Sequence, residues 1–192
     1  MRSKTKFVRY LLVVRTIVTK CWSFSPKFLS HFILSGFRHS TTYFSFGLRY
    51  LALHRLSKSC GEKVVIFPGV YLKHIHNLEV GTNVTIHEMS YIDAYGGIKI
   101  GNDVAISHGV SIISFDHDIN KDKFNFKNCP PIIGQIILEN NIWVGAGAKI
   151  LKNVIIGKNS VIAASSLVNK SYQPNSIIAG IPAKVVKEII YK

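Results

Sequence analysis

Aliphatic residues return at every sixth position along most of this chain. From residue 138 onward, the first residue of each successive six is aliphatic without exception: Leu138, Val144, Ile150, Ile156, Ile162 and Val168. Upstream, the same spacing gives Val80, Ile86 and Ile92 and, after a two-residue insertion at Gly96 and Gly97, Ile100, Ile106 and Ile112. This period fits neither an α-helix nor the two-residue alternation of an ordinary sheet. It is typical of short strands joined by corners, three of which close a triangular coil of about 18 residues.

The remaining positions of the repeat agree with such a coil. The fifth residue of each six is usually small or β-branched, as at Val84, Val104, Ala148 and Ser160. Glycine or another small residue often follows the aliphatic one, where we expect the backbone to turn sharply. The sequence therefore predicts a mainly β protein, with a parallel β-helix of hexapeptide repeats over residues 63–187 and a short C-terminal tail at 188–192.

The first third of the chain follows a helical pattern instead. Residues 4–20, 27–37 and 42–58 are predicted helices, and residues 1–62 form a basic N-terminal helical segment. In the third helix we expect Phe44, Leu48, Leu51 and Leu56 to share a packed face, with Arg49 elsewhere. Residues 1–63 hold 12 of the 24 Lys and Arg residues but a single acid, Glu62.

Two interpretations of this segment stay open. It is either a helical cap that packs on the β-helix or on a neighbouring subunit, or a surface that contacts anionic membrane through residues 1–60. No nucleic-acid-binding motif accompanies the charge, so we expect no nucleic-acid partner. The apolar stretch 7–18 is interrupted by Arg9 and Arg15, too short to span a bilayer and without the form of an export signal.

The three cysteines, Cys21, Cys60 and Cys129, are far apart and show no metal-ligand spacing. An odd number suggests no disulfide framework and fits a reducing compartment. We therefore expect a cytoplasmic protein, peripheral to the inner membrane if the basic segment contacts lipid, and we expect no bound metal.

The most specific stretch runs from 142 to 189, "IWVGAGAKILKNVIIGKNSVIAASSLVNKSYQPNSIIAGIPAKVVKEI". It resembles the hexapeptide-repeat acyltransferases, the left-handed parallel β-helix family, and the resemblance extends over residues 64–187. Within that family the chain is most similar to the maltose and galactoside O-acetyltransferases and those of capsule or lipopolysaccharide. The resemblance implies a homotrimer that uses acetyl-CoA as co-substrate.

The repeat stops at residues 113–134, "ISFDHDINKDKFNFKNCPPIIG". A coil can extend a loop at a corner without disturbing the stacked column, and long excursions from compact domains are usually functional or disordered. We interpret residues 115–134 as a lid or acceptor-binding arm. By resemblance, His117 at its start is the general base that takes the proton of the attacking hydroxyl. Imidazole, whose reference pKa is about 6.5, suits that transfer near neutral pH.

Acidic residues are the candidates for the acceptor site. "YIDAYGGIKIG" resembles the segment one coil before the catalytic histidine, and an acid there contacts acceptor hydroxyls or orients the histidine, which makes Asp93 the second catalytic candidate. Asp116 and Asp118 are alternative orienting residues. Glu88 stands near the place where galactoside-type enzymes have an asparagine, a departure that suggests a different acceptor.

For the donor, small residues would let the pantetheine arm of CoA approach the backbone. By resemblance, the CoA-binding candidates are Trp143, Gly145, Ala146, Ala163, Ala164, Asn169, Lys170, Lys184 and Lys187. Asn169 departs from the Thr of a Thr-Lys pair in relatives, whereas Lys170 keeps the charge. Lysines after "GIP" would meet the nucleotide phosphates as point charges.

The predicted function is acetyl-CoA-dependent O-acetylation of a sugar hydroxyl in bacterial surface polysaccharide, with direct transfer and a histidine base. An amino-sugar nucleotide or serine is the alternative acceptor. A non-catalytic β-helix scaffold is the alternative of another class. Zinc held by His74, His76, His108 and His117 from neighbouring subunits, as in carbonic anhydrases of this fold, is a further alternative.

Overall fold

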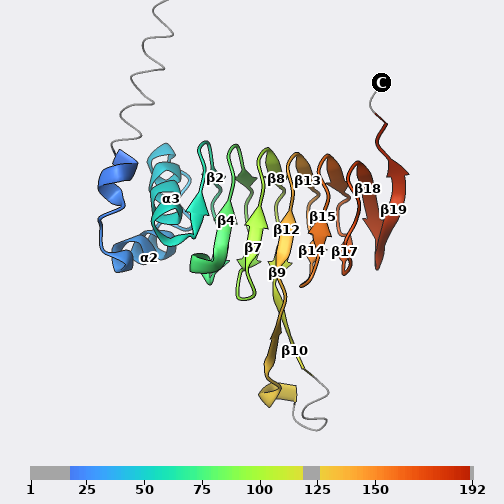
Figure 1. Ribbon diagram of the computed structural model, residues 1–192. Helices are drawn as coiled ribbons and strands as arrows, with labels where there is room; N and C mark the ends of the chain where they lie inside the picture. The colour runs from blue at the N-terminus through green and yellow to red at the C-terminus, as the bar shows by residue number, and fades with distance from the viewer. Residues whose placement is uncertain (1–17, 119–125, 191–192) are drawn as a thin grey trace, which may run out of the picture.

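The computed structural model describes residues 18–118 and 126–190, and their main body is a three-sided solenoid of short strands (Figure 1). Its first sheet, in chain order, holds β1 (Ser59–Cys60), β4 (Leu78–Val80), β7 (Ile98–Ile100), β12 (Ile136–Leu138) and β15 (Ile155–Ile156). The second holds β2 (Val65–Ile66), β5 (Thr85–Ile86), β8 (Val104–Ile106), β13 (Ile142–Val144), β16 (Ser160–Ile162), β18 (Ser176–Gly180) and β19 (Ala183–Glu188). The third holds β3 (Tyr71–Lys73), β6 (Tyr91–Asp93), β9 (Ser111–Ile113), β14 (Lys149–Ile150) and β17 (Leu167–Val168).

Neighbouring strands in these sheets are parallel, apart from the terminal pair of β18 and β19. Each pair joins equivalent positions of successive coils, so that Ile106 lies beside Val144 and Ile112 beside Ile150. The arrangement confirms the predicted parallel β-helix, because only a repeat that closes a coil can stack in this register.

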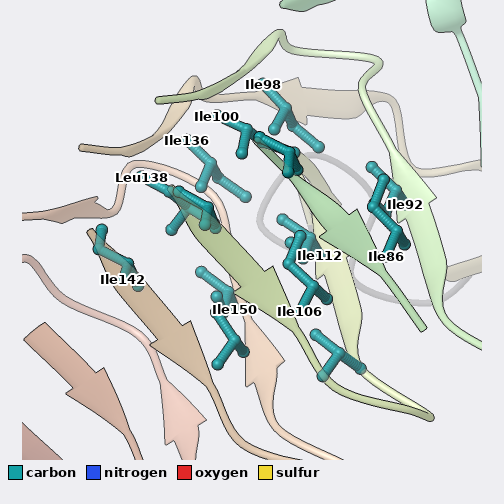
Figure 2. Close-up of a cluster of buried hydrophobic side chains, with 14 of the residues drawn as sticks. Ile86, Ile92, Ile98, Ile100, Ile106, Ile112, Ile136, Leu138, Ile142 and Ile150 are labelled. Atoms are coloured by element: carbon teal, nitrogen blue, oxygen red, sulfur yellow. The ribbon is translucent and has the colours of Figure 1, made fainter. Parts of the chain in front are cut away.

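The six-residue column forms the core of the solenoid. Ile106, Ile112 and Ile150 are each fully buried, and Figure 2 shows their side chains packed inside the coils. Burying one such side chain contributes roughly 1.5–3 kcal/mol, so the column supplies much of the stability of the fold.

The small residues after the column serve a different purpose from the one predicted. Positive φ occurs further along each corner, for example at Asn83, where φ is 59°. A Cβ atom on Gly81 would lie 2.6 Å from the carbonyl carbon of Gly101, and one on Gly145 would lie 2.5 Å from the amide nitrogen of Ala164. Glycine is therefore required here by the close approach of successive coils.

Two helices cover the N-terminal end of the solenoid (Figure 1). These helices, α2 (Lys27–Gly36) and α3 (Tyr43–Leu56), agree closely with the predicted ranges. The predicted helix 4–20 lies mostly outside the described residues. Within the described part of the chain, residues 18–22 are helical. Thr42 caps α3 by accepting a hydrogen bond from the Ser45 amide at 3.3 Å. No helix among the described residues is long and apolar enough to cross a membrane.

The buried face of α3 differs from the prediction. Phe44 is 72% exposed, whereas Arg49 is only 2% exposed. The buried residues of the helix are Ser45, Arg49, Ala52, Leu53 and Leu56. The arginine is buried because the Nε group donates to the Ile66 carbonyl at 2.8 Å, and Nη1 to the carbonyls of Phe37 and Ser40 at 2.8 and 2.9 Å.

Candidate active site

The break in the repeat is a β-hairpin that projects from the solenoid (Figure 1). Strand β10 (Phe115–His117) pairs in antiparallel fashion with β11 (Pro131–Ile133), and the short 3-10 helix η2 (Phe126–Asn128) precedes β11. The chain leaves the third sheet after β9 and re-enters the first sheet at β12. The base of the hairpin therefore lies at the edge between these two sheets.

His117 is held at this base by its own hairpin. Its Nδ1 atom lies 2.9 Å from the carbonyl oxygen of Cys129, across the hairpin. A carbonyl can only accept a hydrogen bond, so Nδ1 carries the proton and the neutral ring presents a lone pair at Nε2. The Asp116 carboxylate accepts from the backbone amide of His117 at 2.8 Å, which restrains the backbone at the same point. This orientation is the one that a general base needs.

The imidazole borders a cavity of about 480 Å³. The lining residues are Ile113, Phe115, Asp116, His117, Leu151, Lys152 and Asn169. The cavity thus joins the candidate base to two other predicted site residues, Asp116 and Asn169. Asp116 also faces Lys152, with 4.0 Å between its carboxylate and the ammonium nitrogen. Asp118 does not line this cavity. Its backbone amide donates to the Pro130 carbonyl at 2.9 Å, across the hairpin.

Asp93 lies one coil earlier, buried with 4% exposure. Its carboxylate contacts His74, 2.7 Å from Nδ1, and accepts from the Tyr91 hydroxyl at 3.2 Å and the Tyr95 amide at 3.2 Å. The pKa of Tyr91 is raised, mainly by burial and secondly by the negative charge of Asp93. The Tyr91 hydroxyl therefore keeps its proton and donates to the Asp93 carboxylate. Asp93 therefore orients His74 rather than His117, although both histidines lie along one edge.

A row of rings joins these two histidines. His74 lies 4.6 Å from Tyr95, Tyr95 lies 5.6 Å from Phe115, and Phe115 lies 6.0 Å from His117, measured between ring centroids. The edge between the third and first sheets thus carries both candidate catalytic residues.

The small residues predicted to meet CoA lie on the other edge of the third sheet. The amide of Gly145 donates to the Ile162 carbonyl at 2.7 Å and that of Ser165 to the Ala146 carbonyl at 2.8 Å, so Gly145, Ala146, Ala163 and Ala164 meet at stacked corners. Glu88 occupies the position equivalent to Ala146 on this edge, two coils earlier. Its carboxylate oxygen lies 3.5 Å from Nδ1 of His87. The width of a three-residue strand, about 10 Å, separates this edge from that of His117.

The remaining donor candidates are spread around the C-terminal coils. Trp143 lies on β13, 57% exposed, and its indole donates to the Ser107 hydroxyl at 3.1 Å. Lys170 follows Asn169 on the edge of His117 and lies 5.8 Å from the Tyr172 ring. Lys184 and Lys187 lie on β19, beside Ala179 and Ile177 of β18. Among the described residues, these candidates therefore lie on separate strands and corners.

Sequence reasoning missed Lys152, and it named His74 without linking it to Asp93. Lys152 follows Ile150, which stacks on Ile112, so the coil register could have placed it near the hairpin. His74 follows Lys73, which lies beside Asp93 in the same way.

Among the described residues, no group of three His, Cys, Asp or Glu side chains could hold a metal ion.

Comparisons with known proteins place this geometry in a family. The model of the bacterial transferase hexapeptide family (six repeats) matches residues 136–170. The putative acetyltransferase YJL218W of Saccharomyces cerevisiae is 32% identical over 143 residues, 73% of this chain and 70% of that protein. The chain belongs to the hexapeptide-repeat acetyltransferases. Membership confirms the family predicted from the sequence.

Further members of the family are similar over shorter spans. The galactoside O-acetyltransferase of Escherichia coli (strain K12) is 33% identical over 130 residues, 67% of this chain and 63% of that protein. The putative lipopolysaccharide biosynthesis O-acetyl transferase WbbJ of the same strain is 30% identical over 113 residues, 55% of this chain and 58% of that protein. The chain thus spans somewhat less than two thirds of these relatives.

A solved member extends the likeness to three dimensions. The structure of galactoside acetyltransferase in complex with coenzyme A has a TM-score of 0.76 and 28% identity, and the match covers 85% of this chain and 80% of that one. This agreement confirms the predicted fold, a left-handed parallel β-helix preceded by helices.

Proposed function

We propose that the protein is an acetyl-CoA-dependent O-acetyltransferase that acts on a sugar hydroxyl of bacterial surface polysaccharide. The observation that carries the proposal is the His117 imidazole, whose Nδ1–H is directed to the Cys129 carbonyl while the ring borders the cavity at the hairpin base. The galactoside and lipopolysaccharide enzymes among the relatives support a sugar acceptor, and the coenzyme A in the solved relative supports the donor.

The chemistry follows from the orientation of the ring. Nε2 of His117 takes the proton of the acceptor hydroxyl as its oxygen attacks the thioester carbonyl carbon. The tetrahedral intermediate then collapses, the carbon–sulfur bond breaks, and the imidazolium returns the proton to the sulfur of CoA. The Cys129 carbonyl keeps its hydrogen bond throughout and stabilises the positive ring. The acetyl group passes directly to the acceptor, without a covalent enzyme intermediate.

A homotrimer would complete the site. The small-residue corners at Gly145 and Ala164 lie on the edge opposite His117. Packing the β-helices side by side, as the family resemblance implies, would bring one subunit's corners to another's hairpin and form a groove for pantetheine. Lys170, Lys184 and Lys187 would then meet the nucleotide phosphates as cations.

We further propose that the enzyme is cytoplasmic and contacts the inner membrane through its helical segment. Five aromatic side chains at this end are between 63% and 97% exposed: Phe24, Phe28, Phe32, Tyr43 and Phe44. Aromatic residues beside basic ones suit an anionic lipid surface. The test is liposome flotation of the Phe28→Ser/Phe32→Ser variant against Val186→Ser, an exposed apolar residue of β19. Loss of flotation in the first variant alone supports the contact, and equal flotation removes it.

The function itself is tested by acceptor-dependent release of CoA from acetyl-CoA. The acceptor panel contains neutral glycosides, an amino-sugar nucleotide and serine. Faster CoA release with glycosides supports the proposal, whereas preference for the amino sugar or serine would replace the acceptor. If no acceptor accelerates CoA release, the result contradicts the proposed function and supports the alternative of a non-catalytic scaffold.

A further inference from the structure

A basic groove lies between α2 and the first coil of the solenoid. It has a volume of about 470 Å³. Lys27 and His31 face it from α2, and Lys73, His74 and His76 face it from β3 and the 3-10 helix η1 (Ile75–Asn77). Its remaining described lining is apolar, formed by Leu56, Leu72 and Ile75. Of the described residues that line the groove, none is an aspartate or a glutamate.

Few carboxylates among the described residues neutralise the positive side chains that line this groove. One carboxylate contacts a lining residue of the groove: Asp93, which is buried and lies 2.7 Å from Nδ1 of His74. Lys27 and Lys73 take part in no ion pair with another described residue. A cleft whose walls carry one sign of charge concentrates its electrostatic field and attracts a ligand of opposite charge.

An adjoining cavity adds two guanidinium groups. This cavity, of about 280 Å³, shares His31, Leu72 and Ile75 with the groove and is also lined by Arg38 and Arg49. Nη2 of Arg49 and Nε of Arg38 are buried and have no hydrogen-bond partner among the described residues. Buried donors are nearly always paired in native proteins. Unpaired donors beside the groove therefore independently indicate an anionic ligand.

The groove lies on the same edge of the solenoid as His117. Lys73 lies beside Asp93, and Asp93 lies beside Ile113, which borders the cavity of the candidate base. Adjacent strands are about 4.8 Å apart, which puts the Lys73 backbone roughly 10 Å from that of Ile113. One ligand can therefore span both places, with a hydroxyl at His117 and an anionic group in the groove.

We propose that this groove binds a phosphate or diphosphate group attached to the acceptor sugar. The inference rests on the proposed function and names the class of acceptor: a glycosyl phosphate. Lys27 and Lys73 contact the phosphate oxygens as ammonium donors. His74, oriented by Asp93, lines the groove and is the first ring of the row that leads to His117. Charge-assisted hydrogen bonds to phosphate are among the stronger polar contacts in proteins.

The first test measures binding without catalysis. Inorganic diphosphate is titrated by calorimetry, at low ionic strength, into the full-length protein and into Lys73→Ala and Lys27→Ala/Lys73→Ala variants. The matched control is Lys99→Ala, an exposed lysine on β7 that lines neither cavity. We expect about tenfold weaker binding for Lys73→Ala, further weakening for the double variant and unchanged binding for the control. Equal affinity in all four proteins, or no binding by the unmodified protein, would overturn the proposal.

The second test separates this inference from the proposed function. The same sugar is supplied as a methyl glycoside and as a glycosyl phosphate. We expect a lower KM for the phosphate form, an advantage that Lys27→Ala/Lys73→Ala removes while leaving kcat and the KM of the methyl glycoside unchanged. Equal KM values for both forms in the unmodified enzyme would refute the phosphate subsite and leave sugar acetylation standing.

Competition identifies the source of the phosphate. Farnesyl diphosphate represents a lipid-linked sugar, and uridine diphosphate represents a nucleotide sugar. Stronger competition by the first indicates a lipid-linked acceptor, and stronger competition by the second a nucleotide-linked one. Both outcomes support a phosphate site, whereas failure of both compounds to compete with inorganic diphosphate contradicts it.

Discussion

Replacing Arg49 by alanine should loosen the helical end of the protein from the solenoid. The guanidinium group connects three segments: it donates to the Phe37 and Ser40 carbonyls of the loop after α2, to the Ser45 hydroxyl within α3, and to the Ile66 carbonyl of β2. The Arg49→Ala change removes these bonds and leaves buried carbonyls without donors. It also leaves a cavity beside the Phe46 ring, which lies 4.7 Å from the guanidinium carbon.

The size of the effect follows from these contacts. A hydrogen bond to a charged group contributes about 1.5–3 kcal/mol, and such contributions from one side chain are not additive. Burial of the charge opposes this gain, and the same burial lowers the pKa of Arg49. Since a buried acceptor left without its donor costs about 1–3 kcal/mol and several carbonyls lose their donor together, we expect a loss of roughly 3 kcal/mol in the free energy of unfolding.

The measurement is urea unfolding followed by tryptophan fluorescence at a constant protein concentration. Trp22 reports on the helical end, where its indole donates to the Ser30 hydroxyl at 3.2 Å, and a Trp143→Phe background removes the solenoid's signal. The control is Arg55→Ala on the same helix, which loses one bond to the Ser25 carbonyl. Because this bond is only partly buried, we expect a loss of at most about 1.5 kcal/mol. Equal losses for the two variants, or a loss below about 1 kcal/mol for Arg49→Ala, would refute this account of the buried arginine.

Three further predictions concern the solenoid and its surface. Ile106→Ala, at a fully buried column position, should lower the free energy of unfolding by about 2–5 kcal/mol, whereas an unchanged urea midpoint would contradict the stacked core. Burial raises the pKa of the Cys60 thiol to about 12, so roughly one molecule in ten thousand is thiolate at pH 8. A Cys21→Ser/Cys129→Ser variant, in which Cys60 is the remaining thiol, should therefore show no fast thiol reaction in the native state. The hydrogen bond from Lys58 lowers the pKa of Glu79 below 4.5, so the stabilisation from this pair is present above the unfolded pKa and is lost as the pH falls through the folded value. Lys58→Ala should therefore remove at most about 1 kcal/mol at pH 7 and nothing at pH 2, as measured by urea unfolding at both values.

The parts of the fold that repeat could be predicted from the sequence. The column at Ile100, Ile106 and Ile112 repeats because successive coils stack equivalent residues, and this regularity is visible in one chain. The excursion could be located for the same reason, as an interruption of the period. The ranges of α2 and α3 followed from helical spacing.

The contacts that are not periodic could not be predicted in this way. Arg49 is buried because backbone carbonyls from three segments converge on it, a fact of tertiary structure that a helical pattern does not contain. The partner of Asp93 is His74 because a left-handed residue with φ of 51° turns the chain after β3, and composition gives no sign of that turn. The hydrogen bond from His117 to Cys129 depends on the hairpin register, which the sequence left open.

The account depends most on the role of His117 as the general base. The direct measurement is the kcat of acetyl transfer by His117→Ala, compared with the unmodified enzyme and with His39→Ala, an exposed histidine of the α2–α3 loop. Acetyl-CoA affinity is measured on the same preparations to show that donor binding is intact. We predict a loss of about 100- to 10,000-fold in kcat for His117→Ala alone, at unchanged donor affinity. A kcat within about twofold of the unmodified enzyme would contradict the proposed mechanism, because positioned proton transfer contributes far more than that.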